Sequence, residues 1–177
     1  MKKLLFFPVC VLLAFSSCKK DSDKKATASN TITASVGGSN LNFNTGAIAE
    51  LESSSGEYAI EIGGSTTTGS SGQAVSIVVE SESPIVTGTY TLNSMTNTIA
   101  TSFPKIQYIE NQSSSNLISY ETDVTGAYSS TVTITAISST NVQGTFNGVL
   151  ISGQNSTDTK TISNGKFNVN ISPTKVQ

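Results

Sequence analysis

The chain has 177 residues and a formal net charge of −2, and only 12% of its residues are charged. Soluble domains usually contain about 25%, and here all ten basic residues are Lys. The absence of His and Arg excludes imidazole as a general base or metal ligand and guanidinium as an anion clamp. The acidic balance argues against nucleic acid as a partner, because nucleic-acid-binding domains carry a basic face. The composition is instead rich in hydroxyl and amide groups, with 29 Ser, 24 Thr and 14 Asn.

The first residues predict export. Two lysines stand at the start, residues 4–15 are almost entirely apolar, and two small residues precede Cys18. This arrangement is typical of a secretory signal, and the apolar run is shorter than the roughly 20 residues that span a membrane. The sequence Phe15-Ser16-Ser17-Cys18 resembles the lipobox of bacterial lipoproteins, with Phe in place of the usual Leu. The resemblance implies cleavage before Cys18 and lipidation of its sulfur; the alternative is an ordinary secretory signal with an incidental Cys.

Three segments follow from this interpretation: a signal peptide at 1–17, the lipidated Cys with a flexible tether at 18–30, and one domain at 31–177. Cys10 would be removed with the signal, so the mature chain would hold one sulfur and no disulfide. Residues 19–29 contain no large apolar side chain, which predicts a tether that reaches roughly 18 Å. Acyl chains such as palmitate would make the membrane a partner. Lys19, rather than Asp, follows the Cys, which by lipoprotein sorting rules favours the outer membrane and leaves the orientation of the domain open.

From Thr31 onward, apolar and polar residues alternate with the period of two that is typical of half-buried strands. The clearest stretches are 31–36, 131–136 and 166–171. Further strands are predicted at 40–44, 47–52, 58–62, 74–80, 88–92, 106–110, 117–120 and 141–151, between turn clusters rich in Gly, Ser and Asn. We therefore predict an all-β fold, a single antiparallel β-sandwich or barrel of about 8–10 strands.

Three of these strand patterns contain Gly, any residue and an aromatic residue in succession, beginning at Gly88, Gly144 and Gly165. Such an echo could indicate a repeated binding unit. It could also be structural, because Gly admits a bulge or turn where a buried ring begins a strand face. The irregular spacing favours the structural interpretation.

The order of the strand patterns carries a second resemblance. The patterns are Ala34-Ser35-Val36-Gly37-Gly38, Gly88-Thr89-Tyr90-Thr91-Leu92, Val142-Gln143-Gly144-Thr145-Phe146 and the closing Ile162-Ser163-Asn164-Gly165-Lys166-Phe167. Their order resembles that in a family of small Bacteroidota lipoproteins whose domain has no assigned function. The resemblance covers most of residues 31–171 and implies a β-rich lipoprotein without implying an activity.

Carboxylates are the main candidates for acid–base chemistry. The pairs to consider are Glu57 with Glu61, Glu80 with Glu82, and Glu121 with Asp123. Two-carboxylate hydrolases hold their acid groups roughly 5–10 Å apart and also carry Trp, His or Arg to hold sugar, none of which occurs here. We therefore expect no enzymatic activity, no catalytic residue and no cofactor, with a carboxylate-based hydrolase as the least favoured alternative.

One region is the best candidate for binding. Tyr108, Tyr120 and Tyr128 lie near one another in the sequence, with Glu121 and Asp123 among them, and Tyr is favoured at interfaces. These five residues are the candidate contacts for an unknown protein or glycan partner. Residues 121–126 are also the best candidate for a calcium loop, but their spacing does not match the twelve-residue loop, so no metal ligand is assigned. The expected function is that of a non-enzymatic, lipid-anchored envelope protein with a binding or structural role, and the alternative is a glycan- or cation-binding accessory module.

Overall fold

The computed structural model describes residues 30–68, 72–92, 102–111 and 115–172. The predicted signal peptide, Cys18 and nearly all of the tether lie outside these residues. The described chain contains eleven strands: β1 (Thr31–Val36), β2 (Ser39–Asn42), β3 (Thr45–Ser54), β4 (Glu57–Ser65), β5 (Ala74–Ser81), β6 (Gly88–Leu92), β7 (Ser102–Glu110), β8 (Ile118–Thr122), β9 (Ser130–Ile137), β10 (Asn141–Ser152) and β11 (Thr159–Asn170).

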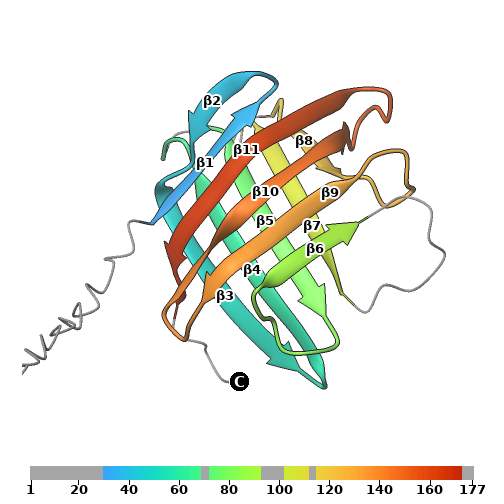
Figure 1. Ribbon diagram of the computed structural model, residues 1–177. Coiled ribbons are helices and arrows are strands. Elements are labelled where there is room, and N and C mark those ends of the chain that lie inside the picture. Colours follow the sequence, from blue (N-terminus) through green and yellow to red (C-terminus); the bar gives the residue numbers. More distant parts are fainter. Residues whose placement is uncertain (1–29, 69–71, 93–101, 112–114, 173–177) are drawn as a thin grey trace, which may run out of the picture.

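The strands form one curled antiparallel sheet. Its order is β2-β1-β11-β10-β8-β7-β5-β4-β3, and β9 pairs with β10 and carries β6 on its other side. The sheet bends over itself, so that β3, β4, β5 and β7 lie behind β1, β11, β10 and β9 (Figure 1). Near one edge, the Ser172 N–H donates to the Ala49 carbonyl at 2.7 Å, beside a parallel bridge from Ala49 to Ile171. The predicted all-β architecture is confirmed, and its form is a half-barrel.

The inward-facing residues of the alternating strands fill the half-barrel. Ile32, Val132 and Ile134 are at most 1% exposed, as their period-two pattern predicts. Three aromatic rings pack in series, with centroids 6.3 Å apart from Phe43 to Tyr108 and 6.1 Å apart from Tyr108 to Tyr120. Side chains therefore occupy the interior of the described fold, as in other small barrels.

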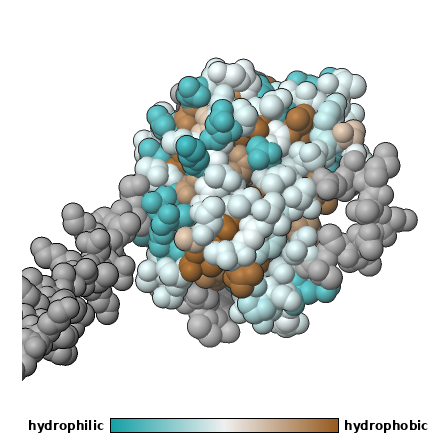
Figure 2. Space-filling model, viewed as in Figure 1, coloured by the Kyte–Doolittle hydropathy of each residue, from teal (hydrophilic) through white to brown (hydrophobic). Residues whose placement is uncertain are grey.

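The outward-facing residues of β6 and β9 include pairs of hydroxyl-bearing side chains. The hydroxyls of Thr89 on β6 and Thr133 on β9 lie 3.1 Å apart in a cross-strand pair, which suits the wet face of a sheet. The face turned to the viewer in Figure 2, across β1, β11, β10 and β9, is mostly pale, the colour of residues with hydropathy near zero. In the part of the chain that the structure describes, no helix has the length and apolar character needed to cross a membrane.

Two of the Gly-x-aromatic segments have a shared structural role. Gly144 on β10 pairs with Phe167 on β11, and Phe146 pairs with Gly165, so each ring lies over the glycine of the opposite strand. The ring centroids of Phe146 and Phe167 are 6.4 Å apart. A Cβ at either glycine would overlap the facing ring and a backbone oxygen, whereas Gly88 has no such neighbour. The structural interpretation is thus correct for Gly144 and Gly165.

Two strands begin four or more residues before their predicted starts. β11 begins at Thr159 rather than near residue 166. The alternating pattern is broken at Asn164, which adopts a φ of 52°, and the pairing with β10 shifts register there. Such a bulge interrupts the alternation while the strand continues. β7 begins at Ser102 and includes Pro104. The Ile106 N–H, two residues further on, donates to Thr122 on the side away from β5, so the missing N–H of Pro104 falls on an unpaired edge, where Pro is tolerated.

Candidate functional site

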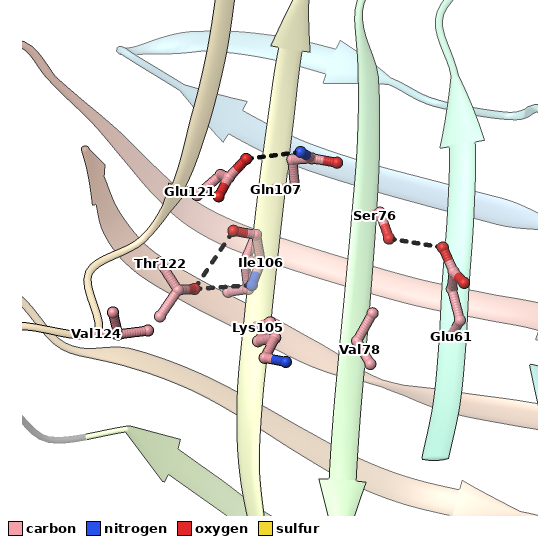
Figure 3. Close-up of a pocket in the computed structure, with 9 residues that line it drawn as sticks. All are labelled: Glu61, Ser76, Val78, Lys105, Ile106, Gln107, Glu121, Thr122 and Val124. Carbon is pink, nitrogen blue, oxygen red and sulfur yellow. Dashed lines mark hydrogen bonds between the residues drawn. The ribbon is translucent and has the colours of Figure 1, made fainter. Parts of the chain in front are cut away.

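The outer face of β4, β5, β7 and β8 carries a shallow hollow of about 430 Å³ (Figure 3). The pairing of the strands sets its layout. Ser76 on β5 lies opposite Gln107 on β7, and Gln107 lies opposite Glu121 on β8. A second row places Val78 opposite Lys105. Because these residues occupy outward positions of adjacent strands, they form one continuous surface, which is polar except at Val78.

Hydrogen bonds within the hollow orient its acidic and amide groups. The Ser76 hydroxyl donates to Glu61 Oε1 at 3.0 Å. The Gln107 amide Nε2 donates to Glu121 Oε1 at 2.9 Å and to the Ser119 hydroxyl at 3.2 Å. The second donor bond fixes the amide orientation, so Gln107 Oε1 is turned away from Glu121. The polar groups are therefore held in place without a ligand.

Lys105 is the cation of the hollow. Its Nζ lies 2.7 Å from Glu80 Oε1 and 5.1 Å from the centre of the Phe103 ring. The two charged side chains are 47% and 39% exposed, and exposed pairs of this kind contribute about 0–1 kcal/mol. Lys105 is thus positioned by Glu80 and Phe103, and within the described part of the chain two of its three N–H groups have no partner.

Apolar side chains complete the hollow. Val78 is half-buried between the polar groups, and Val124 stands at the rim with 74% of its surface exposed. Val124 projects because β8 ends two residues earlier and the chain turns sharply at Asp123. The surface therefore combines hydrogen-bonding groups with two patches suited to C–H contacts.

β8 ends at this rim with Thr122, whose buried hydroxyl contacts that of Ser130. Thr122 Oγ1 accepts a hydrogen bond from the Ile106 N–H at 2.7 Å and lies 3.2 Å from the Ser130 hydroxyl. It thus replaces the missing neighbouring strand for that part of β7. A buried N–H without such a partner would cost about 1–3 kcal/mol.

Asp123 holds the turn that follows. One carboxylate oxygen accepts from the Thr125 N–H and hydroxyl at 2.8 and 2.7 Å, and the other accepts from the N–H groups of Ala127 and Tyr128 at 2.7 and 3.1 Å. Burial acts to raise the pKa of the Asp123 carboxyl, but the hydrogen bonds outweigh it and bring the pKa down to about 2. Both oxygens are engaged within the loop, and Glu121 points into the hollow. Residues 121–126 are therefore arranged as a self-bonded turn rather than as a calcium loop.

The five predicted binding residues do not form one surface. Tyr108 and Tyr120 are 1% and 3% exposed and face the interior, whereas Glu121 lies in the outer hollow. Asp123 is 1% exposed inside its turn, and Tyr128 is 38% exposed. Since strand neighbours alternate between faces, Tyr120 and Glu121 point in opposite directions. Of the five, Glu121 is the residue that lines the hollow.

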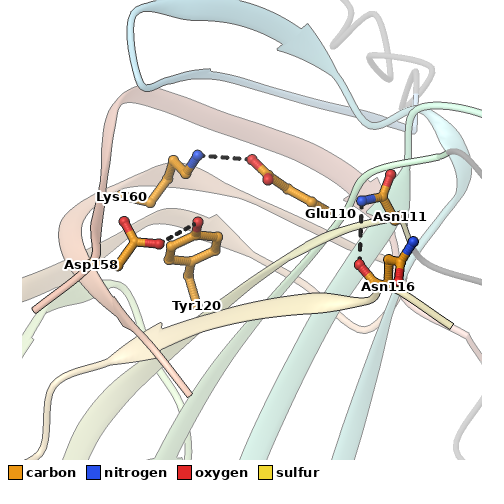
Figure 4. Close-up of polar contacts among 6 residues, drawn as sticks. All are labelled: Glu110, Asn111, Asn116, Tyr120, Asp158 and Lys160. Atoms are coloured by element: carbon orange, nitrogen blue, oxygen red, sulfur yellow. Dashed lines mark hydrogen bonds and ion pairs between the residues drawn. The ribbon is translucent and has the colours of Figure 1, made fainter. Parts of the chain in front are cut away.

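Tyr120 belongs to a polar network at one end of the half-barrel (Figure 4), and its ring packs against that of Tyr108. Lys160 Nζ lies 2.8 Å from Glu110 Oε1 and 4.8 Å from the centre of the Tyr120 ring, whose hydroxyl donates to Asp158 at 3.1 Å. Burial raises the pKa of Tyr108 well above its ordinary value, and the Glu110 carboxylate raises it further. Burial and the bond to Asp158 raise the pKa of Tyr120, and the bond to Glu110 raises that of Lys160. These shifts keep both phenols protonated and Lys160 charged, which suits a structural cap.

The structure places the three acidic pairs suggested by the sequence in three different arrangements. Glu57 and Glu61 lie four residues apart on one face of β4, a separation of about 13 Å along a strand. Glu80 is engaged by Lys105, and Asp123 is buried in the turn after β8, whereas Glu121 lines the hollow. Glu61 on β4 and Glu121 on β8 stand on backbones that are three strand spacings apart, about 14 Å, and their carboxylates each reach one strand inward, to Ser76 and Gln107. Among the described residues, no three acidic side chains lie close enough together to hold a metal ion.

The sequence alone does not single out Ser76, Lys105 or Gln107. They are isolated polar residues on three outward strand positions, and only the strand order brings them beside Glu61 and Glu121. The available signal is their place on the polar side of the period-two pattern. Comparison with protein-family models, curated proteins and solved structures found no match to the chain.

Proposed function

We propose that the chain is a non-enzymatic, lipid-anchored protein of the cell envelope that binds a partner through the outer face of its half-barrel. The anchor is supported by Phe15-Ser16-Ser17-Cys18 and by the apolar run before it. The first strand begins at Thr31, so residues 19–30 separate the proposed lipid from the folded part. The resemblance to small Bacteroidota lipoproteins and the outer-membrane location belong to the same proposal.

The binding role is supported chiefly by one observation: the interior of the half-barrel is filled by side chains, whereas the outer face of β4, β5, β7 and β8 is hollowed and polar. A ligand is thus expected on the outside of the sheet. The hollow contains preoriented hydrogen-bonding groups on strands rather than on loops, which lowers the cost of ordering them on binding. The lipid would present this surface at the membrane.

The non-enzymatic part of the proposal is supported by residue types and contacts. The chain has no His or Arg, and the two carboxylates of the hollow, Glu61 and Glu121, are hydrogen-bonded to Ser76 and Gln107. Lys105, the nearest base, is paired with Glu80. These features suit binding better than acid–base catalysis.

A glycan-binding module is the second candidate, and the mixture of donors, acceptors and apolar patches in the hollow favours it. A cation-binding module has less support, because both carboxylate oxygens of Asp123 are already engaged by Thr125, Ala127 and Tyr128. The glycan-binding and cation-binding candidates share the lipid anchor and differ in the ligand that the domain would bind.

Metabolic labelling with palmitate in a diderm bacterial host tests the anchor. The chain offers a matched control, since Cys10 lies in the signal and Cys18 at the cleavage site. Wild type and Cys10→Ser should take up label and sediment with outer membranes, whereas Cys18→Ser should do neither. Label in Cys18→Ser, or loss of label in Cys10→Ser, would refute the lipid anchor.

A further inference from the structure

We infer that the hollow on β4, β5, β7 and β8 binds a neutral polyhydroxylated ligand, a short segment of uncharged glycan chain. This inference rests on the proposed binding function and names the class of ligand. It is carried by the unused hydrogen-bonding capacity of the hollow, by its charges and by its dimensions.

The lining groups retain both acceptors and donors. Glu61 and Glu121 each use Oε1 within the sheet, and their Oε2 atoms have no protein partner among the described residues. Gln107 Oε1 also has no protein partner among the described residues, whereas the amide nitrogen of Gln107 donates to Ser119 and Glu121. Lys105 adds two free N–H donors beyond its bond to Glu80. A sugar hydroxyl both donates and accepts, so neighbouring hydroxyls match this alternation of acceptors and donors.

The charges of the hollow disfavour ionic ligands. An anionic chain would approach the carboxylates of Glu61 and Glu121, and the Lys105 charge between them is already shared with Glu80. A polycation would gain little from these two exposed carboxylates, because exposed ion pairs contribute about 0–1 kcal/mol, and it would meet the like charge of Lys105. Like charges placed in contact oppose binding, so the least opposed ligand is a neutral one.

The shape of the hollow sets the size of the ligand. Its volume of about 430 Å³ lies within the range of roughly 300–1,000 Å³ for small-ligand sites. The hollow extends from β4 to β8, whose backbones are three strand spacings apart, about 14 Å. A ligand that lies across all four strands is longer than one sugar ring. Val78, between Glu61 and Lys105, and Val124, at the rim, provide contacts for the C–H faces of the rings.

The test is calorimetric titration of the full chain, purified in mild detergent, with hexasaccharides. The neutral probes are those of maltose, cellulose, mannan and xylan type; oligogalacturonate is the anionic probe and chitosan hexamer the cationic one. We expect one or more neutral probes to bind and both charged probes to bind more weakly. Glu61→Ala and Glu121→Ala should each weaken binding by about tenfold, since each removes a hydrogen bond to a charged group.

Glu57→Ala is the matched control, because Glu57 is exposed on the same face of β4 but does not line the hollow. It should leave affinity unchanged, and all three variants should keep the wild-type melting temperature. Absence of binding by every neutral probe, preference for a charged probe, or an equal loss in Glu57→Ala would overturn the inference. Failure of the anchor would show separately as lost palmitate labelling with carbohydrate binding intact.

Discussion

The reciprocal pairing of glycine and phenylalanine on β10 and β11 makes a prediction with a definite sign. In Gly165→Ala, the new methyl group would overlap the backbone oxygen and the ring of Phe146. Extra methyl groups in a packed core cost about 1–3 kcal/mol, and a strand Ala recovers about 0.5–1 kcal/mol relative to Gly. Because one obstacle is backbone and cannot rotate away, we expect the upper part of the range, a net loss of about 2 kcal/mol.

Gly88→Ala provides the matched control. Gly88 also precedes an aromatic strand residue, but no heavy atom lies within 4 Å of its prospective Cβ and its φ is not positive. The substitution should therefore stabilise the fold by up to about 1 kcal/mol, through the lower entropy of the unfolded chain. The two variants are expected to change the free energy of unfolding in opposite directions.

Urea denaturation followed by far-ultraviolet circular dichroism measures both changes, since the chain has no Trp to serve as a fluorescence probe. At about 2–4 °C per kcal/mol for a chain of this size, Gly165→Ala should also lower the melting temperature by about 4–8 °C. Equal stability of Gly165→Ala and Gly88→Ala, at unchanged denaturant slope, would refute the proposed packing of Phe146 over Gly165.

Two further predictions concern the rim of the hollow. Asp123→Asn should lower the free energy of unfolding by about 2 kcal/mol above pH 4, since a folded pKa of about 2 against an ordinary 3.8 corresponds to stabilisation of this size. The difference from wild type should shrink as the pH falls from 4 through 2, where the wild-type carboxylate takes up its proton, and a pH-independent difference in denaturation curves would contradict the assigned role. Thr122→Val removes the acceptor for the buried Ile106 N–H and should cost about 1–3 kcal/mol, whereas Thr135→Val, at an exposed site, should change stability by less than about 0.5 kcal/mol. Equal unfolding midpoints for these two Thr variants would contradict the proposal that Thr122 stabilises the fold by accepting the Ile106 N–H.

The sequence predicts the strands well because burial on one face of a sheet imposes a period of two. Residues 31–36 and 88–92 match β1 and β6 in full. The prediction fails where tertiary packing overrides the local pattern. β11 continues across the bulge at Asn164, and β7 accommodates Pro104 on an edge that only the finished sheet defines.

The site is less accessible from sequence than the fold. Tyr108 and Tyr120 were candidates for a ligand surface, but aromatic residues that alternate with polar ones suit a core equally well, and the structure buries both. The hollow is instead assembled from single outward residues on four strands. Their proximity depends on strand order and register, which depend on the whole chain.

The most direct test of binding on the outer face is a titration followed by ¹⁵N–¹H chemical shifts. The full chain in mild detergent would be titrated with the neutral hexasaccharide that binds best by calorimetry. Binding on the outer face should concentrate the shift changes at Ser76, Gln107 and Glu121, on the hollowed face, while Val132 and Ile134 in the interior stay unchanged. Changes centred on Lys160 and Glu110 at the end of the half-barrel, or on the inward residues, would contradict it.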